Sequence, residues 1–251
     1  KVRDIVIRVS NRLEKPHALN LLRYVGKNRD KYGDFVSKAL VHVLRDEKNH
    51  AYVKKILPEF GETAAIHLCG ALNDKNRRAI AGEILADIGI KAVNPVTGAL
   101  KNEEIKESAE KILLKISSHS PEHAKQVTNS LTGALKNEER KESAEKILQQ
   151  IAKHSPEHAK QVTNSLTGAL KDNQTKESAV KLLVGIGKPA IFACAHALKN
   201  PDQRYGAKKV LLMLKKRLGD EVDKKLAGYN PKDSFDRKEI FEEIRKTRQV
   251  R

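Results

Sequence analysis

The sequence contains no tryptophan, and aromatic residues make up only 4% of its 251 residues. With so few aromatic residues we expect no dominant aromatic cage, and single-stranded nucleic acid, whose bases stack on aromatic rings, is disfavoured as a ligand. Cysteine is also scarce. Cys69 and Cys194 are too few for a disulfide framework or a zinc site. Both occupy columns of the repeat described below that suit buried positions, so we expect inert thiols and no metal or other cofactor.

Long apolar runs and catalytic motifs are absent as well. No stretch approaches the roughly 18 apolar residues of a membrane helix, and no signal-peptide pattern opens the chain. The sequence has no Walker loop, no GxGxxG and no nucleophile elbow. We therefore expect a protein that is not an enzyme, takes no small-molecule substrate and is cytoplasmic, or nuclear in a eukaryote.

What the sequence does have is positive charge and an internal repeat. The formal net charge is +17, which favours acidic partners such as nucleic acid or an acidic protein. Residues 119–136 read HSPEHAKQVTNSLTGALK, and residues 154–171 repeat them letter for letter. A fixed period of this size indicates stacked units that bury their apolar faces against one another. The Leu that closes each GAL-like segment recurs after 28 or 35 residues, at Leu44, Leu72, Leu100, Leu135, Leu170, Leu198 and, weakly, Leu226.

Each repeat predicts two helices. Ser120 and Ser155, each followed by Pro, predict the start of a long first helix, and the second helix follows an Asp or Asn cap. The seven extra residues of the longer repeats belong to the first helix. Pro58 should end or kink one second helix. Glycines near the ends of the first helices predict close approach by a neighbouring helix; they are Gly70, Gly98, Gly133 and Gly168. The caps of the second helices are Asp46, Asp74, Asn102, Asn137, Asp172 and Asn200.

One repeat carries a family resemblance. The segment IGKPAI at 186–191, followed by ALKNPD at 197–202, resembles the HEAT-like repeats of the phycobilisome-lyase type. The resemblance covers nearly the whole chain and implies an all-α fold, a right-handed α-solenoid of about seven to eight helix pairs. We expect one array over residues 1–251. It would comprise an N-terminal capping pair at 1–32, central repeats at 33–215 and a degenerate C-terminal capping pair at 216–251, with a last helix beginning near Ser234.

A row of lysines is the first candidate binding site. In five of the second helices a Lys lies two residues before the apolar anchor, on the exposed side of the helical wheel, whereas Asn20 and Glu83 take this place in the other two. The resemblance implies that second helices line the concave face, where this lysine row would meet an acidic partner. Glu residues one turn earlier pair with Lys in the same helices and reduce the local charge, at 107 and 111, 142 and 146, and 177 and 181. The lysine row consists of Lys55, Lys111, Lys146, Lys181 and Lys209.

Three further patterns are open to a structural or a functional interpretation. Apolar residues on the same face are either protein anchors or are covered by the next repeat: Leu114, Val184 and Leu212. A basic column resembles the family's Arg position, which implies a ladder pairing each cation with an Asp or Asn between repeats. The ladder comprises Arg78, Lys106, Lys141, Lys176 and Arg204 with Asp46, Asp74 and Asp172 as charged partners; His50 also falls in the column. His119 and His123, like His154 and His158, have metal-pair spacing, but a Ser-Pro cap separates them, so we expect no metal site.

The favoured function is a non-catalytic HEAT-like scaffold that binds an acidic protein surface on its second-helix face. Sequence-nonspecific binding to a duplex backbone is the first alternative, because residues 199–251 carry 16 Lys and Arg against 9 Asp and Glu. HEAT-like DNA glycosylases share the architecture, but they use aromatic residues including Trp, and no position here matches their motif. An engineered or purely structural repeat without a natural ligand is the second alternative, because the internal copies are so nearly identical.

Overall fold

A computed structural model describes residues 2–12, 17–27 and 32–227 of the chain. All regular structure in this part is helical, without a strand, so the predicted all-α class is confirmed. The chain divides into two compact units, Lys1–Ile116 and Ser117–Arg251. The last helix predicted near Ser234 lies outside the described residues. None of the described helices is both long and apolar enough to cross a lipid bilayer.

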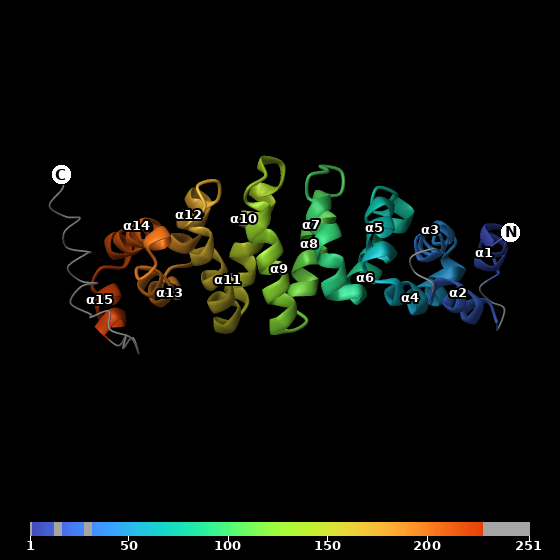
Figure 1. The fold of residues 1–251 in the computed structure, drawn as a ribbon, viewed down its shortest axis with the longest axis horizontal. Coiled ribbons are helices and arrows are strands. Elements are labelled where there is room, and N and C mark those ends of the chain that lie inside the picture. Colours follow the sequence, from blue (N-terminus) through green and yellow to red (C-terminus); the bar gives the residue numbers. More distant parts are fainter. Residues whose placement is uncertain (1, 13–16, 28–31, 228–251) are drawn as a thin grey trace. The chain divides into compact units, whose positions relative to one another are not determined.

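The N-terminal unit is built from helices that pack on their second neighbours as well as their first (Figure 1). Helix α1 packs on α3, α3 on α5 and α5 on α7, and α2 packs on α4. Short 3₁₀ segments, η2 (Glu47–Asn49), η3 (Leu57–Phe60) and η4 (Gly89–Ala92), connect them. The bounds are α1 (Val2–Ser10), α2 (Ala18–Lys27), α3 (Asp34–Val43), α4 (His50–Ile56), α5 (Glu62–Ala71), α6 (Lys75–Ile88), α7 (Val93–Ala99) and α8 (Lys106–Ser117).

The C-terminal unit has two layers of helices (Figure 1). First helices α9, α11, α13 and α15 pack on one another in order, and second helices α10, α12 and α14 do the same in the other layer. This alternation is the stacking of helix pairs that the repeat predicts. The bounds are α9 (Pro121–Ala134), α10 (Glu138–His154), α11 (Pro156–Ala169), α12 (Lys176–Ile186), α13 (Ala190–Ala197), α14 (Pro201–Leu218) and α15 (Asp220–Ala227).

The core consists of the apolar positions that recur with the repeat. In α10, the predicted stripe of Ala144, Ile147, Leu148 and Ile151 is almost completely buried. The Leu that closes each GAL-like segment is at most 1% exposed in all seven copies, from Leu44 to Leu226. Helical spacing of these residues gives each helix one apolar side, and stacking removes that side from water.

The predicted helix starts are confirmed at the Ser-Pro sites. The hydroxyls of Ser120 and Ser155 accept hydrogen bonds from the backbone N–H groups of His123 and His158, and a proline opens each helix. Five of the six Asp and Asn caps accept from a backbone N–H two residues later. Asn137 is the exception, since its Oδ1 is buried and has no hydrogen-bond partner among the described residues.

Proline and repeat length set the helix lengths as predicted. Helix α4 ends at Ile56, and Pro58 lies in the 3₁₀ segment that follows it. The longer repeats have first helices of 14 residues, α9 and α11, whereas α13 in a shorter repeat has 8. This difference leaves α13 too short to cover the whole side of α11.

The expected role of the recurring glycines is wrong. A Cβ atom built on Gly70, Gly98, Gly133 or Gly168 would meet no neighbouring atom within 4 Å. In the described structure, therefore, no neighbouring helix packs closely against these glycines. The tight glycine is instead Gly206 of α14, where a Cβ would lie 3.0 Å from Cδ2 of Leu170 and 3.1 Å from its Cβ.

Candidate binding surface

The lysine row lies on five second helices, and Glu83 takes the place of the lysine on α6. Lys55 is on α4, Lys111 on α8, Lys146 on α10, Lys181 on α12 and Lys209 on α14, and all five side chains are exposed. In the C-terminal unit, α10 packs on α12 and α12 on α14. Because Lys146, Lys181 and Lys209 share one position of the repeat, the packing brings these three into one line on a single unit.

Carboxylates lie close to part of this row. Lys111 pairs with Glu107 one turn earlier, at 2.7 Å, as predicted. Lys181 departs from the prediction, because its Nζ lies 2.7 Å from Glu145 on the neighbouring helix α10 and the expected partner was Glu177. The side-chain hydrogen bond to Glu145 raises the pKa of Lys181 above its ordinary value. The Lys181 side chain is 68% exposed whereas that of Glu145 is 13% exposed, so an external carboxylate can reach Lys181 but competes with Glu145 for it.

The apolar residues beside the row are half-buried. Leu114, Val184 and Leu212 each retain part of their exposure, so the adjacent helices cover them in part. The more exposed apolar side chain of this region is Met213 on α14, which is 43% exposed. A partner's anchor would therefore find less apolar surface at the three predicted positions than the sequence pattern alone indicates.

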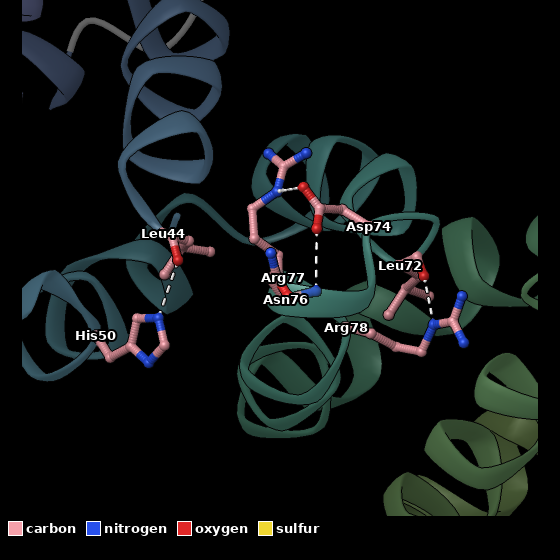
Figure 2. A network of polar contacts seen from close by, with 7 residues as sticks. All are labelled: Leu44, His50, Leu72, Asp74, Asn76, Arg77 and Arg78. Carbon is pink, nitrogen blue, oxygen red and sulfur yellow. Dashed lines mark hydrogen bonds and ion pairs between the residues drawn. The ribbon is translucent and has the colours of Figure 1, made fainter. Parts of the chain in front are cut away.

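The arginines of the predicted ladder contact backbone carbonyls within one helix pair, contrary to the prediction, as Figure 2 shows for Arg78. Nε of Arg78 donates to the backbone carbonyl of Leu72 at 2.7 Å, and Nε of Arg204 donates to the carbonyl of Leu198 at 2.9 Å. His50 contacts the carbonyl of Leu44 through Nε2 at 2.9 Å. Each acceptor is the cap residue that ends the preceding first helix. The contact joins the two helices of one pair, and its physical basis is the partial negative charge of the carbonyls at a helix C-terminus.

The lysines of the same column find partners near the start of their own helices. Lys106 pairs with Glu103 at 3.1 Å, Lys141 with Glu138 at 3.2 Å, and Lys176 donates to Asn173 at 2.9 Å. A lysine ammonium has no planar donor fork like that of arginine and is satisfied by the nearest oxygen. None of these three recorded contacts links two repeats.

Two of the three predicted acidic partners also pair with a residue close to them in the sequence. Asp46 pairs with Lys48 and Asp74 with Arg77, both within one helix start. Only Asp172 bridges repeats, at 2.6 Å from Nζ of Lys136. The hydrogen bond from Lys136, with that from the backbone of Gln174, holds the pKa of Asp172 below its ordinary value. A link between repeats therefore exists at Asp172, but with a different cation from the one the family pattern implies.

The paired histidines belong to the helix starts. His119 and His123 have ring centroids 5.1 Å apart, and His154 and His158 have theirs 4.8 Å apart. Nδ1 of His158 lies 2.6 Å from the Ser155 hydroxyl, and its Nε2 lies 3.4 Å from the carbonyl of Ser117. A neutral ring that accepts from Ser155 and donates to Ser117 satisfies both contacts. In the described part of the chain, no three His, Cys, Asp or Glu side chains gather as a metal site would require.

Both thiols lie in the interior. Cys194 is fully buried and Cys69 is 9% exposed. Burial raises the pKa of each thiol to about 12. A thiol with such a pKa remains protonated near neutral pH and is a poor nucleophile, as predicted for an inert structural cysteine.

Sequence reasoning missed a groove in the first-helix layer of the C-terminal unit. The groove has a volume of about 510 Å³ and lies between α11, α13 and α15. Lys160, Lys188 and Lys225 line it together with Phe192. The sequence carries a signal for this groove, because Pro189 and Ala193 stand where the preceding copy has polar side chains.

Comparisons with known proteins add limited information. A family model described as the SipA vinculin binding site matches residues 122–137 and 157–172, which cover most of the two identical copies. No curated protein sequence matches the chain. Two crystal structures of engineered proteins from the Northeast Structural Genomics Consortium are similar at 19% and 16% identity, with TM-scores of 0.29 and 0.34. The matches cover 75% of this chain and 88% of the first protein, and 97% of this chain and 72% of the second. TM-scores this low support no inference about function.

Proposed function

We propose that this protein is a non-catalytic, HEAT-like repeat scaffold that binds an acidic protein surface along its second-helix face. The observation that carries the proposal is the exposed line of Lys146, Lys181 and Lys209 on three helices packed in one unit. Packing holds the backbones that carry these lysines, so only the lysine side chains need ordering when a partner binds, which favours association. Many modest contacts spread over several repeats then add up to the affinity.

The matched family model supports protein binding as the class of function. Its two segments include α9 and α11, whose apolar residues, among them Val127, Leu131, Val162 and Leu166, are buried in the core. A partner that reads the apolar side of such a helix would have to detach it from the unit, at the expense of this burial. A partner that leaves the fold intact meets the outward polar sides, which favours recognition by charge.

Duplex nucleic acid is the second candidate, and the net charge of +17 favours it. The two candidates differ in their response to salt. Neutralising several phosphates releases counterions, so duplex affinity falls by orders of magnitude between low and moderate salt. An acidic protein surface has a lower charge density than a duplex and releases fewer counterions, so its affinity falls less steeply with salt.

The test is a titration of the full chain against labelled polyglutamate and a labelled random-sequence DNA duplex, each over a salt series. The test variant carries Lys146→Glu, Lys181→Glu and Lys209→Glu. We expect polyglutamate binding that survives physiological salt in the native chain and weakens at least about tenfold in the variant.

The matched control reverses the same number of charges elsewhere on the C-terminal unit, at the exposed residues Lys125, Lys153 and Lys216. The control has the same net charge as the test variant, so it should keep most of the binding. Equal loss in both variants would mean that overall charge, and not the lysine row, attracts the ligand. Steep salt dependence with preference for the duplex would instead favour the nucleic-acid function.

A further inference from the structure

The groove between α11, α13 and α15 exists because two identical helices have different neighbours. Residues 121–134 of α9 and 156–169 of α11 have the same sequence. Helix α11 covers the outer side of α9 with polar side chains. Nε2 of Gln161 donates to the carbonyl of Pro121 at 3.0 Å, and the Ser165 hydroxyl lies 3.3 Å from Oδ1 of Asn129 and 2.9 Å from the Thr132 hydroxyl.

Helix α13 does not cover α11 in the same way. Counted from the closing Leu of each repeat, Pro189 and Ala193 take the places of Gln161 and Ser165. Neither side chain can donate or accept a hydrogen bond. The equivalent side of α11 is left as the wall of the groove, which runs from Pro156 to Thr167. At 1.5 Å per residue this wall is about 16 Å long, the length of roughly five extended peptide residues.

The groove offers donors that are not used within the unit. The ammonium of Lys160 and the side-chain amide of Asn164 are exposed, and neither has a hydrogen-bond or ion-pair partner among the described residues. In the covered copy, Asn129 at the position of Asn164 is bonded to Ser165. Asn164 is therefore free to bond a peptide backbone through both its carbonyl and its NH₂ group.

The charged residues that line the groove are basic. Lys160, Lys188 and Lys225 line it from α11, from the residues just before α13 and from α15, and none of the described lining residues carries a carboxylate. Lys188 pairs with Glu221 at 2.7 Å outside the groove. Nζ of Lys225 lies 5.3 Å from the centre of the Phe192 ring, a cation–π contact at an exposed site.

We propose that this groove binds an acidic segment of a partner protein in which carboxylates flank an apolar side chain. The carboxylates bond to Lys160 and Lys225, the backbone bonds to Asn164, and the apolar side chain covers Phe192 and Ala193. A duplex backbone carries phosphates but presents no apolar side chain to bury against Phe192, which is 37% exposed. The groove lies in the first-helix layer and is separate from the lysine row.

The test uses fluorescence anisotropy with the full chain and a short labelled peptide that has Leu between Glu residues. We expect binding at physiological salt, and at least about tenfold weaker binding by Lys160→Glu. Lys125→Glu is the matched control, because Lys125 is the same residue of the repeat beside the covered side of α9. Ala193→Leu fills the groove without changing the charge and should also weaken binding.

Four outcomes would overturn the proposal: no peptide binding, equal loss in Lys125→Glu, full binding by Ala193→Leu, or equal binding of a peptide with Gln in place of Glu. Groove-dependent binding of a labelled DNA duplex in preference to the peptide would also overturn it. Circular dichroism checks that each variant folds, and Lys160→Gln replaces Lys160→Glu if that variant does not. All variants keep Lys146, Lys181 and Lys209, so failure here leaves the test of the lysine row intact.

Discussion

Replacing both duplicated glycines, Gly133→Ala together with Gly168→Ala, should stabilise the C-terminal unit. Both residues are helical, and an added methyl group would have no atom within 4 Å to displace. Alanine restricts the unfolded chain more than glycine does, which contributes about 0.4–1 kcal/mol for each site. The sites share no contact, so the effects should add to about 0.8–2 kcal/mol.

The assay is urea unfolding followed by circular dichroism, with thermal melting as a second measurement. For a chain of this size, about 1 kcal/mol corresponds to a rise in Tm of roughly 2–4 °C. Two contrasting variants test the same geometry at glycines that do have close neighbours. Gly26→Ala would press its methyl group into the Phe60 ring and should destabilise strongly. Gly206→Ala requires Leu170 to move by a few tenths of an ångström, so it should gain less than the helix-end pair.

A double variant whose free energy of unfolding is equal to or lower than that of the native chain would contradict this prediction. That result would mean that a neighbouring surface does approach these glycines, as the sequence pattern alone had indicated. A stabilised double variant that binds partners less well would locate an interface at these two helix ends.

Three further predictions concern single side chains. Burial raises the pKa of Cys194 to about 12, so a thiol reagent at pH 8 should react with it only after denaturation. The stability of the fold should decrease as the pH rises above about 8.5, because the thiol of the unfolded chain ionises there and that of the folded chain does not. The hydrogen bond from Lys136 lowers the pKa of Asp172 below its ordinary value of 3.8. The ionised carboxylate therefore stabilises the fold above pH 3.8, and this contribution is lost as the pH falls through the lowered pKa. The difference in Tm between the native chain and Asp172→Asn should shrink over that pH range. Arg204→Met removes the hydrogen bond to the Leu198 carbonyl and should cost about 1 kcal/mol in urea unfolding, whereas no change would show that solvent replaces the guanidinium.

Local chemistry explains which parts of the fold the sequence could predict. The Ser-Pro starts, the buried stripe of α10 and the helix end before Pro58 depend on neighbours within a few residues, and they were predicted correctly. The prediction that a helix closely approaches the recurring glycines failed, because the spacing of glycines in the sequence does not show which atoms lie beside them. Asn137 shares the sequence pattern of the other caps but not their hydrogen bond, because its Oδ1 is buried away from any donor.

The candidate sites depended on contacts between helices, which the pattern within one helix does not show. The side chains of Arg78 and Arg204 reach carbonyls six residues earlier, a distance at which a helix start and the preceding helix end meet only after folding. The groove requires a comparison of α11 with α13, since it arises from what Pro189 and Ala193 lack. Exposure of the lysine row was predictable from the helical wheel, whereas the pairing of Lys181 with Glu145 depends on how α10 and α12 pack.

Identity between α9 and α11 also affects how the chain reaches its native state. During refolding, either helix can dock in the place of the other, and the chain then excludes one repeat as a loop. Closing a loop of this size has an entropy that grows only with the logarithm of its length, so the misaligned species is not strongly disfavoured at first. Only later contacts distinguish the two arrangements, because Gln161 and Ser165 suit α9 whereas α11 must accept Pro189 and Ala193. We therefore expect the duplication to create a kinetic trap, which a slow refolding phase would reveal and which substitutions that differentiate the two copies would relieve.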